Sequence, residues 1–136
     1  MMATNTPQTV LIIEDDPIIR NILQTNLTSQ GYQVLAAEDG LKGVQTAKEA
    51  QPGIILMDIR LPNITGWEAT RRLKLEPKTA RIPIIVLTAQ STSQDLQYCF
   101  ESGCDAFMTK PIQFAQLFTK IEMLLNRSFD HPPVAK

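Results

Sequence analysis

Three short runs in the sequence are apolar throughout and rich in isoleucine and valine: Val10 to Ile13, Ile54 to Met57 and Ile84 to Leu87. A strand with one face in water alternates apolar and polar residues, so an uninterrupted apolar run is typical of a strand buried on both faces. Such strands occur in parallel sheets that helices cover on both sides. The three runs therefore predict an α/β fold.

The segments between these runs show the spacing of amphipathic helices. Ile19, Leu23 and Leu27 recur at helical intervals after the first run, as do Leu117 and Ile121 near the C-terminus. Because parallel neighbours need a crossover connection, this alternation predicts a doubly wound parallel sheet of five strands with five helices. Weaker strands are expected at 32–37 and 106–109, and helices near 17–30, 40–51, 66–75, 93–102 and 112–126.

Length and charge indicate one ordinary domain. The 136 residues include 13 Lys and Arg against 14 Asp and Glu, a formal net charge of -1. The sequence has no polybasic stretch, so neither nucleic acid nor an anionic membrane is an expected partner. It also has no signal-peptide pattern and no apolar run long enough for a membrane span. We expect a cytoplasmic protein with a domain at residues 8–127, between disordered tails at 1–7 and 128–136.

The cysteine and histidine content excludes several types of site. Cys99 and Cys104 are five positions apart, which matches no zinc or redox motif, so we expect two buried or half-buried thiols. His131 is the single histidine and lies in a Pro-rich tail. A His-based catalytic triad and a His-rich metal site are therefore excluded.

Polar side chains stand where the expected strands end. Glu14 and Asp15 follow the first strand, Asp58 the third, Thr88 the fourth and Lys110 the last. The carboxyl ends of parallel strands line one edge of the sheet, where binding sites form, so we expect these side chains to converge. The three carboxylates would repel one another unless a cation lay among them, and oxygen ligands with retained waters suit Mg²⁺.

Each of these residues also has an ordinary structural interpretation. Asp16, which precedes Pro17, fits a helix N-cap better than a metal ligand. Lys110 alone is more often a solvated surface lysine, and Thr88 alone a plain strand end. Together, a carboxylate nucleophile, a divalent ion, a hydroxyl and an ammonium describe a receptor for a phosphoryl group. No Gly-rich phosphate loop is present, so no nucleotide or other organic cofactor is expected.

Four segments carry a more specific pattern: Val10–Pro17 (VLIIEDDP), Ile55–Pro62 (ILMDIRLP) with Gly66 shortly after, Ile85–Ala89 (IVLTA) and Thr109–Ile112 (TKPI). In this order and at these separations they resemble the receiver domain of two-component response regulators, in its single-domain, chemotaxis-type form. The resemblance covers about residues 9 to 126. It implies a flavodoxin-like sheet with strand order 2-1-3-4-5 and a phosphoprotein of phosphorelay signal transduction with no attached output domain.

The resemblance implies a role for each residue of the acidic group. Asp58 is the expected phosphoacceptor and Asp15 the expected direct Mg²⁺ ligand. Glu14 would act through a metal-bound water, and the backbone carbonyl of Arg60 would complete the protein ligands. Mn²⁺ is an expected substitute for Mg²⁺.

The resemblance also assigns the phosphoryl contacts and a switch. Thr88 and Lys110 would contact the phosphoryl oxygens, and the peptide bond between Lys110 and Pro111 would be cis. On phosphorylation Thr88 would move inward and Phe107 would follow, although Phe107 is equally well explained as a core residue. The positions that tune phosphoryl lifetime are Arg60 and Gln90, and the candidates for an output surface are Gln94, Tyr98 and Gln113.

By the same resemblance, the partners are a sensor histidine kinase or histidine phosphotransfer protein and a downstream protein target. The chain would be a monomer or a phosphorylation-dependent dimer, and a signalling module that catalyses only its own phosphorylation and dephosphorylation. Three alternatives stay open. The first is an aspartyl-phosphate phosphatase or mutase, although such enzymes usually have a second Asp where this chain has Arg60. The second is a flavodoxin-like cofactor carrier, although such a protein needs a phosphate-binding loop where this chain has its acidic run. The third is a pseudo-receiver adaptor that is not phosphorylated.

Overall fold

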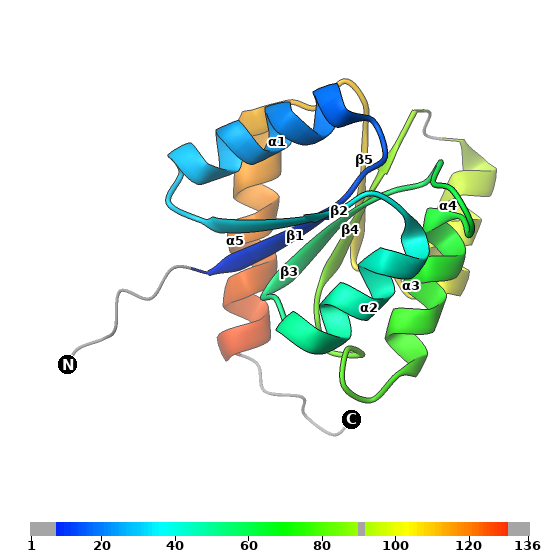
Figure 1. Cartoon of the computed structure of the whole chain (residues 1–136). Helices are drawn as coiled ribbons and strands as arrows, with labels where there is room; N and C mark the ends of the chain where they lie inside the picture. Colours follow the sequence, from blue (N-terminus) through cyan, green and yellow to red (C-terminus); the bar gives the residue numbers. More distant parts are fainter. Residues whose placement is uncertain (1–7, 90–91, 131–136) are drawn as a thin grey trace.

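Strands and helices alternate along the chain in the computed structural model, which describes residues 8–89 and 92–130, with side chains through residue 126 (Figure 1). The strands are β1 (Thr9–Ile13), β2 (Gln33–Ala37), β3 (Ile54–Asp58), β4 (Ile84–Thr88) and β5 (Ala106–Thr109), and the helices are α1 (Pro17–Ser29), α2 (Gly40–Ala50), α3 (Gly66–Leu75), α4 (Ser93–Ser102) and α5 (Phe114–Asp130). The expected alternation is confirmed. The expected tail at 1–7, the tuning position Gln90 and His131 lie outside the described residues.

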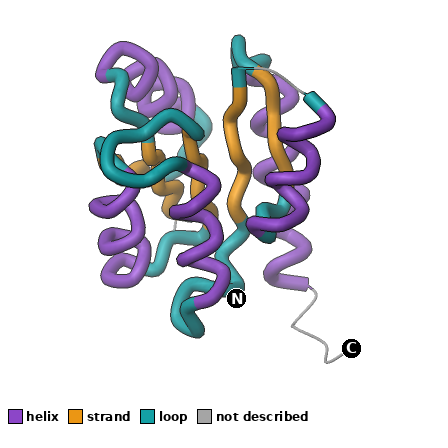
Figure 2. The backbone as a smooth tube through the Cα atoms, turned by 90° about the vertical axis from the view of Figure 1, so that its right-hand side faces the viewer, coloured by secondary structure: helices purple, strands orange, loops and turns teal. Residues whose placement is uncertain are grey.

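The strands form one parallel sheet in the order β2-β1-β3-β4-β5. Across its centre, Ile12 of β1 lies opposite Leu56 of β3, which lies opposite Ile85 of β4. Helices α1 and α5 cover one face, and α2, α3 and α4 cover the other (Figure 1). Figure 2 shows the same backbone from the side, with helices on the outside of the strands. The doubly wound sheet with strand order 2-1-3-4-5 is therefore confirmed.

The apolar runs contain no polar residue because each central strand contributes to two cores. Val10 and Ile12 of β1 pack with residues of α1 and α5, whereas Leu11 and Ile13 pack with residues of α2 and α3. All four side chains are completely buried. Successive side chains of a strand point to opposite faces, so helices on both sides of the sheet leave no position of the strand in water.

The last helix differs from the expectation at both ends. Its spacing predicts residues 112–126, but α5 runs from Phe114 to Asp130, so residues 128–130, expected in a tail, are helical. The chain meets no proline until Pro132, and prolines and the residues before them are what interrupt helices. Neither α5 nor any other helix within the described residues has the length and apolar character needed to cross a membrane.

The two cysteines form a disulfide bond, so the expectation of two thiols is wrong. Cys99 lies near the end of α4, and Gly103, with φ of +84°, turns the chain back toward it. The Cα atoms of Cys99 and Cys104 are consequently 5.3 Å apart, within the range that a disulfide spans. The left-handed turn, and not the spacing in the sequence, makes this bond possible. It ties the end of α4 to the residues just before β5.

The disulfide predicts a loss of stability on reduction. Closing so short a loop in the unfolded chain is worth about 2 kcal/mol, so dithiothreitol is expected to lower Tm by roughly 6–10 °C. A Cys99→Ser, Cys104→Ser double variant should melt at the temperature of the reduced protein with or without dithiothreitol. Thermal melts followed by circular dichroism measure both. Two titratable thiols in the unreduced, denatured wild type would contradict the prediction.

Candidate functional site at the carboxyl edge of the sheet

The polar residues that follow the strands meet at one edge of the sheet, as the sequence predicts. Glu14 and Asp15 come directly after β1, and Asp58 and Thr88 are the last residues of β3 and β4. Lys110 follows β5, and its backbone N–H donates to the carbonyl oxygen of Thr88 at 2.7 Å. Parallel pairing of all five strands is what brings their carboxyl ends together.

Three carboxylates form the centre of the site. Oxygens of Glu14, Asp15 and Asp58 lie within 4.8 Å of one another. The side chains of Glu14 and Asp58 are buried and that of Asp15 is exposed. Like charges this close favour a cation among them, and a set of oxygen donors with one side open to water suits a hard divalent ion. The donor set therefore fits the predicted Mg²⁺ site.

The loop that carries Glu14 and Asp15 is held by contacts from α1. Arg20 donates from Nη1 to the carbonyl oxygen of Glu14 at 2.8 Å and to that of Asp15 at 3.3 Å. The N–H of Asp16 donates to Oε2 of Glu14 at 3.1 Å. With the backbone carbonyls held by Arg20 and one oxygen of Glu14 held by the Asp16 amide, the acidic run has a defined geometry.

Asp16 is a helix cap, as its position before proline predicts. Its Oδ1 accepts hydrogen bonds from the N–H groups of Ile18 at 2.8 Å and Ile19 at 3.4 Å, and Pro17 occupies the first helical position. These bonds satisfy amides that the first turn of a helix leaves unpaired. Of the three consecutive acidic residues, Glu14 and Asp15 belong to the carboxylate cluster and Asp16 to the helix.

Lys110 reaches across the edge to the carboxylates. Its Nζ lies 2.6 Å from Oδ1 of Asp58 and 3.4 Å from Oε1 of Glu14, and 24% of its side chain is exposed. Burial alone would lower the pKa of Lys110, but the hydrogen bond and charge of Asp58, with the charge of Glu14, raise it above its usual value. Lys110 is thus an ammonium fixed in the site, and the interpretation as a solvated surface lysine is wrong.

Glu14 is the carboxylate that the site disfavours electrostatically. Burial raises its pKa above the ordinary 4.5, and the negative charge of Asp58 adds to the increase. The amide of Asp16 and the ammonium of Lys110 act in the opposite direction without cancelling it. A divalent cation would remove the like-charge part of this penalty.

The loop after β3 passes very close to Asp58, and a glycine makes this possible. A Cβ atom at Gly66 would collide with the backbone carbonyl of Asp58. The N–H of Gly66 donates to the carbonyl oxygen of Ile59 at 2.8 Å, which folds the start of α3 back onto the end of β3. This close approach explains why a glycine stands at the end of the loop that follows Asp58.

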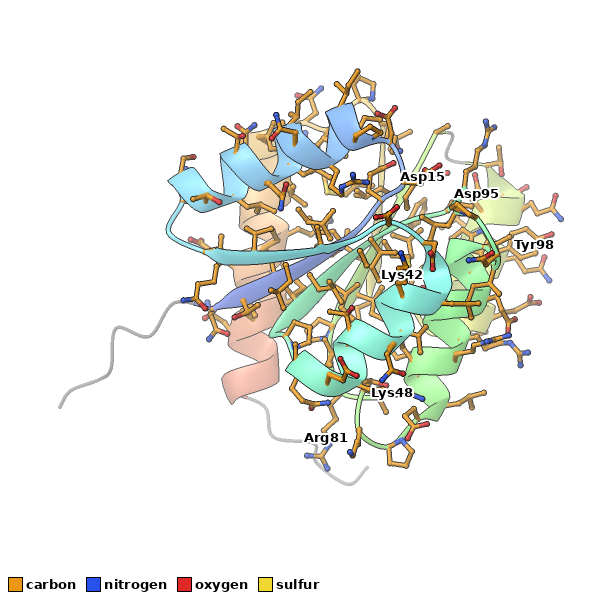
Figure 3. The ribbon with its side chains drawn as sticks, in the orientation of Figure 1. Asp15, Lys42, Lys48, Arg81, Asp95 and Tyr98 are labelled. Carbon is orange, nitrogen blue, oxygen red and sulfur yellow. A yellow bond between two sulfur atoms is a disulfide. The ribbon has the colours of Figure 1, made fainter. Side chains whose placement is uncertain are left out.

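A pocket of about 290 Å³ opens beside Asp58. Asp58, Arg60, Thr88, Asp95 and Lys110 supply its polar lining. The side chain of Thr88 is buried, whereas Arg60 is exposed. Figure 3 labels Asp15 and Asp95 at this end of the sheet, and Lys48 and Arg81 at the opposite end. The expected phosphoryl contacts and the expected acceptor thus share one cavity.

The expected switch and output residues lie nearby. Phe107 of β5 is partly buried against the core that α2 and α3 cover, and in the sheet it is paired with Val86. The peptide bond between Lys110 and Pro111 is cis, as predicted. On α4, Nε2 of Gln94 donates to the hydroxyl of Tyr98 at 2.9 Å, and Tyr98 is 39% exposed. Gln113 is also exposed.

Two residues of the site were not predicted from the sequence. Arg20 lies one helical turn after Asp16 and holds the loop of Glu14 and Asp15. The sequence feature that could have indicated this contact is a cation in the first turn of the helix that follows the acidic run. Asp95 lines the pocket, and its signal was the Thr92-x-x-Asp95 capping-box pattern at the expected start of α4. Neither signal points to the site until the fold brings the helix starts beside the strand ends.

Comparisons with known proteins agree with this arrangement. The family described as response regulator receiver domain matches residues 10–122. The DNA-binding dual master transcriptional regulator RpaA of Synechocystis sp. is 39% identical over 127 residues, which are 93% of this chain and 53% of that protein. The polar-differentiation response regulator DivK of Brucella anthropi is 32% identical over 120 residues, which are 88% of this chain and 98% of DivK. The chain therefore spans about half the length of RpaA and nearly all of DivK.

Solved structures show the same fold. The receiver domain of the sensor histidine kinase PA1611 from Pseudomonas aeruginosa, with a magnesium ion coordinated in its active-site cleft, has a TM-score of 0.83 and 32% identity, and the match covers 89% of this chain and 99% of that one. Because the family match takes in most of the residues and all the strand-end positions described above, this chain belongs to the response regulator receiver domains of two-component systems.

Proposed function

We propose that Asp58 accepts a phosphoryl group from a phosphohistidine of a sensor histidine kinase or a histidine phosphotransfer protein. The observation that supports this most strongly is the 2.6 Å contact between Nζ of Lys110 and Oδ1 of Asp58, in a pocket that Thr88 also lines. Phosphoryl transfer needs mainly positioning and charge neutralisation, and this arrangement supplies both.

The proposed reaction uses groups of the chain itself. A carboxylate oxygen of Asp58 bonds to phosphorus while the bond from phosphorus to the donor nitrogen breaks, and the electron pair stays on that nitrogen. An ionised carboxylate is already a nucleophile, so no general base is required. The ammonium of Lys110 and the hydroxyl of Thr88 would donate hydrogen bonds to the phosphoryl oxygens.

The proposed metal ligands are Glu14 through a water molecule, Asp15, Asp58 and the backbone carbonyl of Arg60. Mg²⁺, or Mn²⁺ in its place, would neutralise the negative charge of the transferring oxygens. The fit rests on the cluster of three carboxylates, because all its donors are oxygens and its net charge is negative.

The proposal extends to signalling. Thr88 and Phe107 would act as the switch, and the surface of α4, β5 and α5 would contact a downstream protein, with the chain a monomer or a phosphorylation-dependent dimer. An aspartyl-phosphate phosphatase is disfavoured because exposed Arg60 occupies the position where such enzymes place a second acid. The pseudo-receiver alternative is disfavoured by the direct Lys110–Asp58 ion pair.

Replacement of the acceptor tests the central claim. Wild-type protein incubated with Mg²⁺ and acetyl phosphate is expected to gain the mass of one phosphoryl group through an acid-stable, base-labile bond, and Asp58→Asn is expected to gain none. Asp16→Asn is the matched control, because asparagine caps a helix as well as aspartate does. Intact-mass spectrometry gives the result. Equal modification of wild type and Asp58→Asn would refute the proposal.

Arg60→Ala is expected to speed loss of the phosphoryl group about two- to fivefold without preventing its addition. An exposed cation at the pocket contributes at most about 1 kcal/mol to holding an anion, which sets the size of the effect. Arg81→Ala, an exposed arginine at the opposite end of the sheet (Figure 3), should decay like wild type. The decay of phosphorylated protein after removal of the donor is the measurement. An unchanged decay rate in Arg60→Ala contradicts this tuning role.

Glu14→Gln is expected to stabilise the metal-free protein. Because the folded-state pKa of Glu14 is raised, the charged form destabilises the fold, and this penalty grows as pH rises from 4.5 through the folded-state pKa and is constant above it. The variant should therefore melt a few degrees above wild type at neutral pH, at about the shift in Tm that a small change in the free energy of unfolding gives in a domain of this size.

The Glu14→Gln effect has two further signatures. The gain in Tm should shrink below pH 4.5, where Glu14 is protonated in both states, and should shrink again when Mg²⁺ is added. Glu101→Gln, which removes an exposed carboxylate on α4, is the control and should leave Tm unchanged. A lower Tm for Glu14→Gln without metal would show that its hydrogen bonds outweigh the repulsion.

A further inference from the structure

Asp95 is an acidic residue of the pocket to which the proposed reaction gives no role. It is the third residue of α4 and lies at the same end of the sheet as Asp15 (Figure 3). Its backbone N–H donates to Oγ1 of Thr92 at 3.1 Å, and its Oδ2 accepts from the N–H of Thr92 at 3.3 Å. These reciprocal bonds form a capping box, which holds the first turn of α4 in place.

The same oxygen of Asp95 also contacts the strand that carries the expected phosphoryl ligand. Oγ1 of Thr88 lies 3.5 Å from Oδ2 of Asp95, so the hydroxyl at the end of β4 donates toward a carboxylate on α4. Asp95 and Thr88 line the pocket beside Asp58 and Lys110. The capping carboxylate of α4 therefore faces the space that a phosphoryl group on Asp58 would enter.

A hydroxyl has a single proton to donate, so it serves one acceptor at a time. At 3.5 Å the contact is longer than a strong hydrogen bond, but the negative charge of the carboxylate still attracts the Thr88 proton, so Asp95 competes for it with a phosphoryl oxygen. We propose that Asp95 is a positioning residue that holds the Thr88 hydroxyl until a phosphoryl group on Asp58 takes it away. This inference rests on the proposed function.

The competition has a consequence for α4. When Thr88 donates to the phosphoryl group, Oδ2 of Asp95 keeps the Thr92 amide and loses its contact with β4. Within its described residues, α4 buries Ser102 alone, so the helix has little apolar packing to replace a lost contact at its start. Asp95 thereby connects occupancy of the pocket to the first turn of α4.

Asp95→Asn is the variant that tests this role. Asparagine offers an oxygen at the same position and so keeps the capping geometry, but it removes the charge that strengthens the bond to Thr88. The probe is fluoroberyllate with Mg²⁺, a stable mimic of the phosphoryl group on a carboxylate. Binding is measured by calorimetry and by the fluorescence of Trp67, whose ring centroid lies 5.8 Å from that of Tyr98 on α4.

Asp95→Asn is expected to bind fluoroberyllate about two- to threefold more tightly than wild type, because a contact of 3.5 Å lies at the weak end of hydrogen-bond strengths. Glu101→Gln removes the same charge from the other end of α4 and should match wild type. In a Thr88→Ala background, Asp95→Asn is expected to have no effect, because there is no hydroxyl to compete for. Circular dichroism melts establish that each variant is folded.

The outcomes separate this inference from the proposed function. If wild type binds fluoroberyllate but Asp58→Asn does not, and Asp95→Asn binds as wild type does, the role of Asp95 is wrong and the acceptor role of Asp58 stands. A gain that persists in the Thr88→Ala background would also overturn the role, because it would come from net charge or capping. If wild type neither binds the probe nor accepts a phosphoryl group, the proposed function and this inference fall together.

Discussion

The ion pair between Lys110 and Asp58 is the contact on which the whole carboxyl edge depends. β1 and β3 are neighbours in the sheet, so their ends bring carboxylates within 4.8 Å of one another. Lys110 comes from the far edge strand and places its ammonium 2.6 Å from Asp58 and 3.4 Å from Glu14. One side chain thus links the ends of β1, β3 and β5 and, together with the backbone N–H of Asp16, offsets part of the repulsion between the carboxylates.

This site works against the stability of the fold that carries it. The raised pKa of Glu14 shows that its charge is disfavoured even with Lys110 in place. The opposing contribution comes from the strands directly behind the site, where Ile12, Leu56 and Ile85 are wholly buried across neighbouring strands. Burial of the uninterrupted apolar strands therefore offsets the free-energy cost of placing charged residues at the ends of the same strands.

The features that the sequence predicted are those that depend on local patterns. Apolar runs and helical spacing led to the sheet and its helices, and the rule for parallel strand ends led to Asp58, Thr88 and Lys110. The contacts that escaped prediction depend on tertiary placement. Cys104 meets Cys99 because Gly103 adopts a left-handed conformation, and Asp95 meets Thr88 because the first turn of α4 lies beside the end of β4. The alternatives for Asp16 and Lys110 were settled by their hydrogen-bond partners, which spacing does not reveal.

Helix α4 is held differently from the other helices. It leaves Leu96 55% exposed and Phe100 88% exposed, whereas Leu23 and Leu27 of α1 are buried in a continuous core. Within the described part of the chain, contacts at the start, middle and end of α4 hold it instead.

The first turn of α4 meets β4 through Asp95 and Thr88, its middle meets α3 through Tyr98 and Trp67, and its end meets the start of β5 through the disulfide. An element with few buried apolar contacts shifts at a smaller cost in free energy than one packed along its length. The disulfide restrains one end of α4 covalently, so under the proposed role of Asp95 a change at Thr88 would act mainly on the other end. That role would make the first turn of α4, and not α1 or α5, the helical segment that responds to what occupies the pocket beside Asp58.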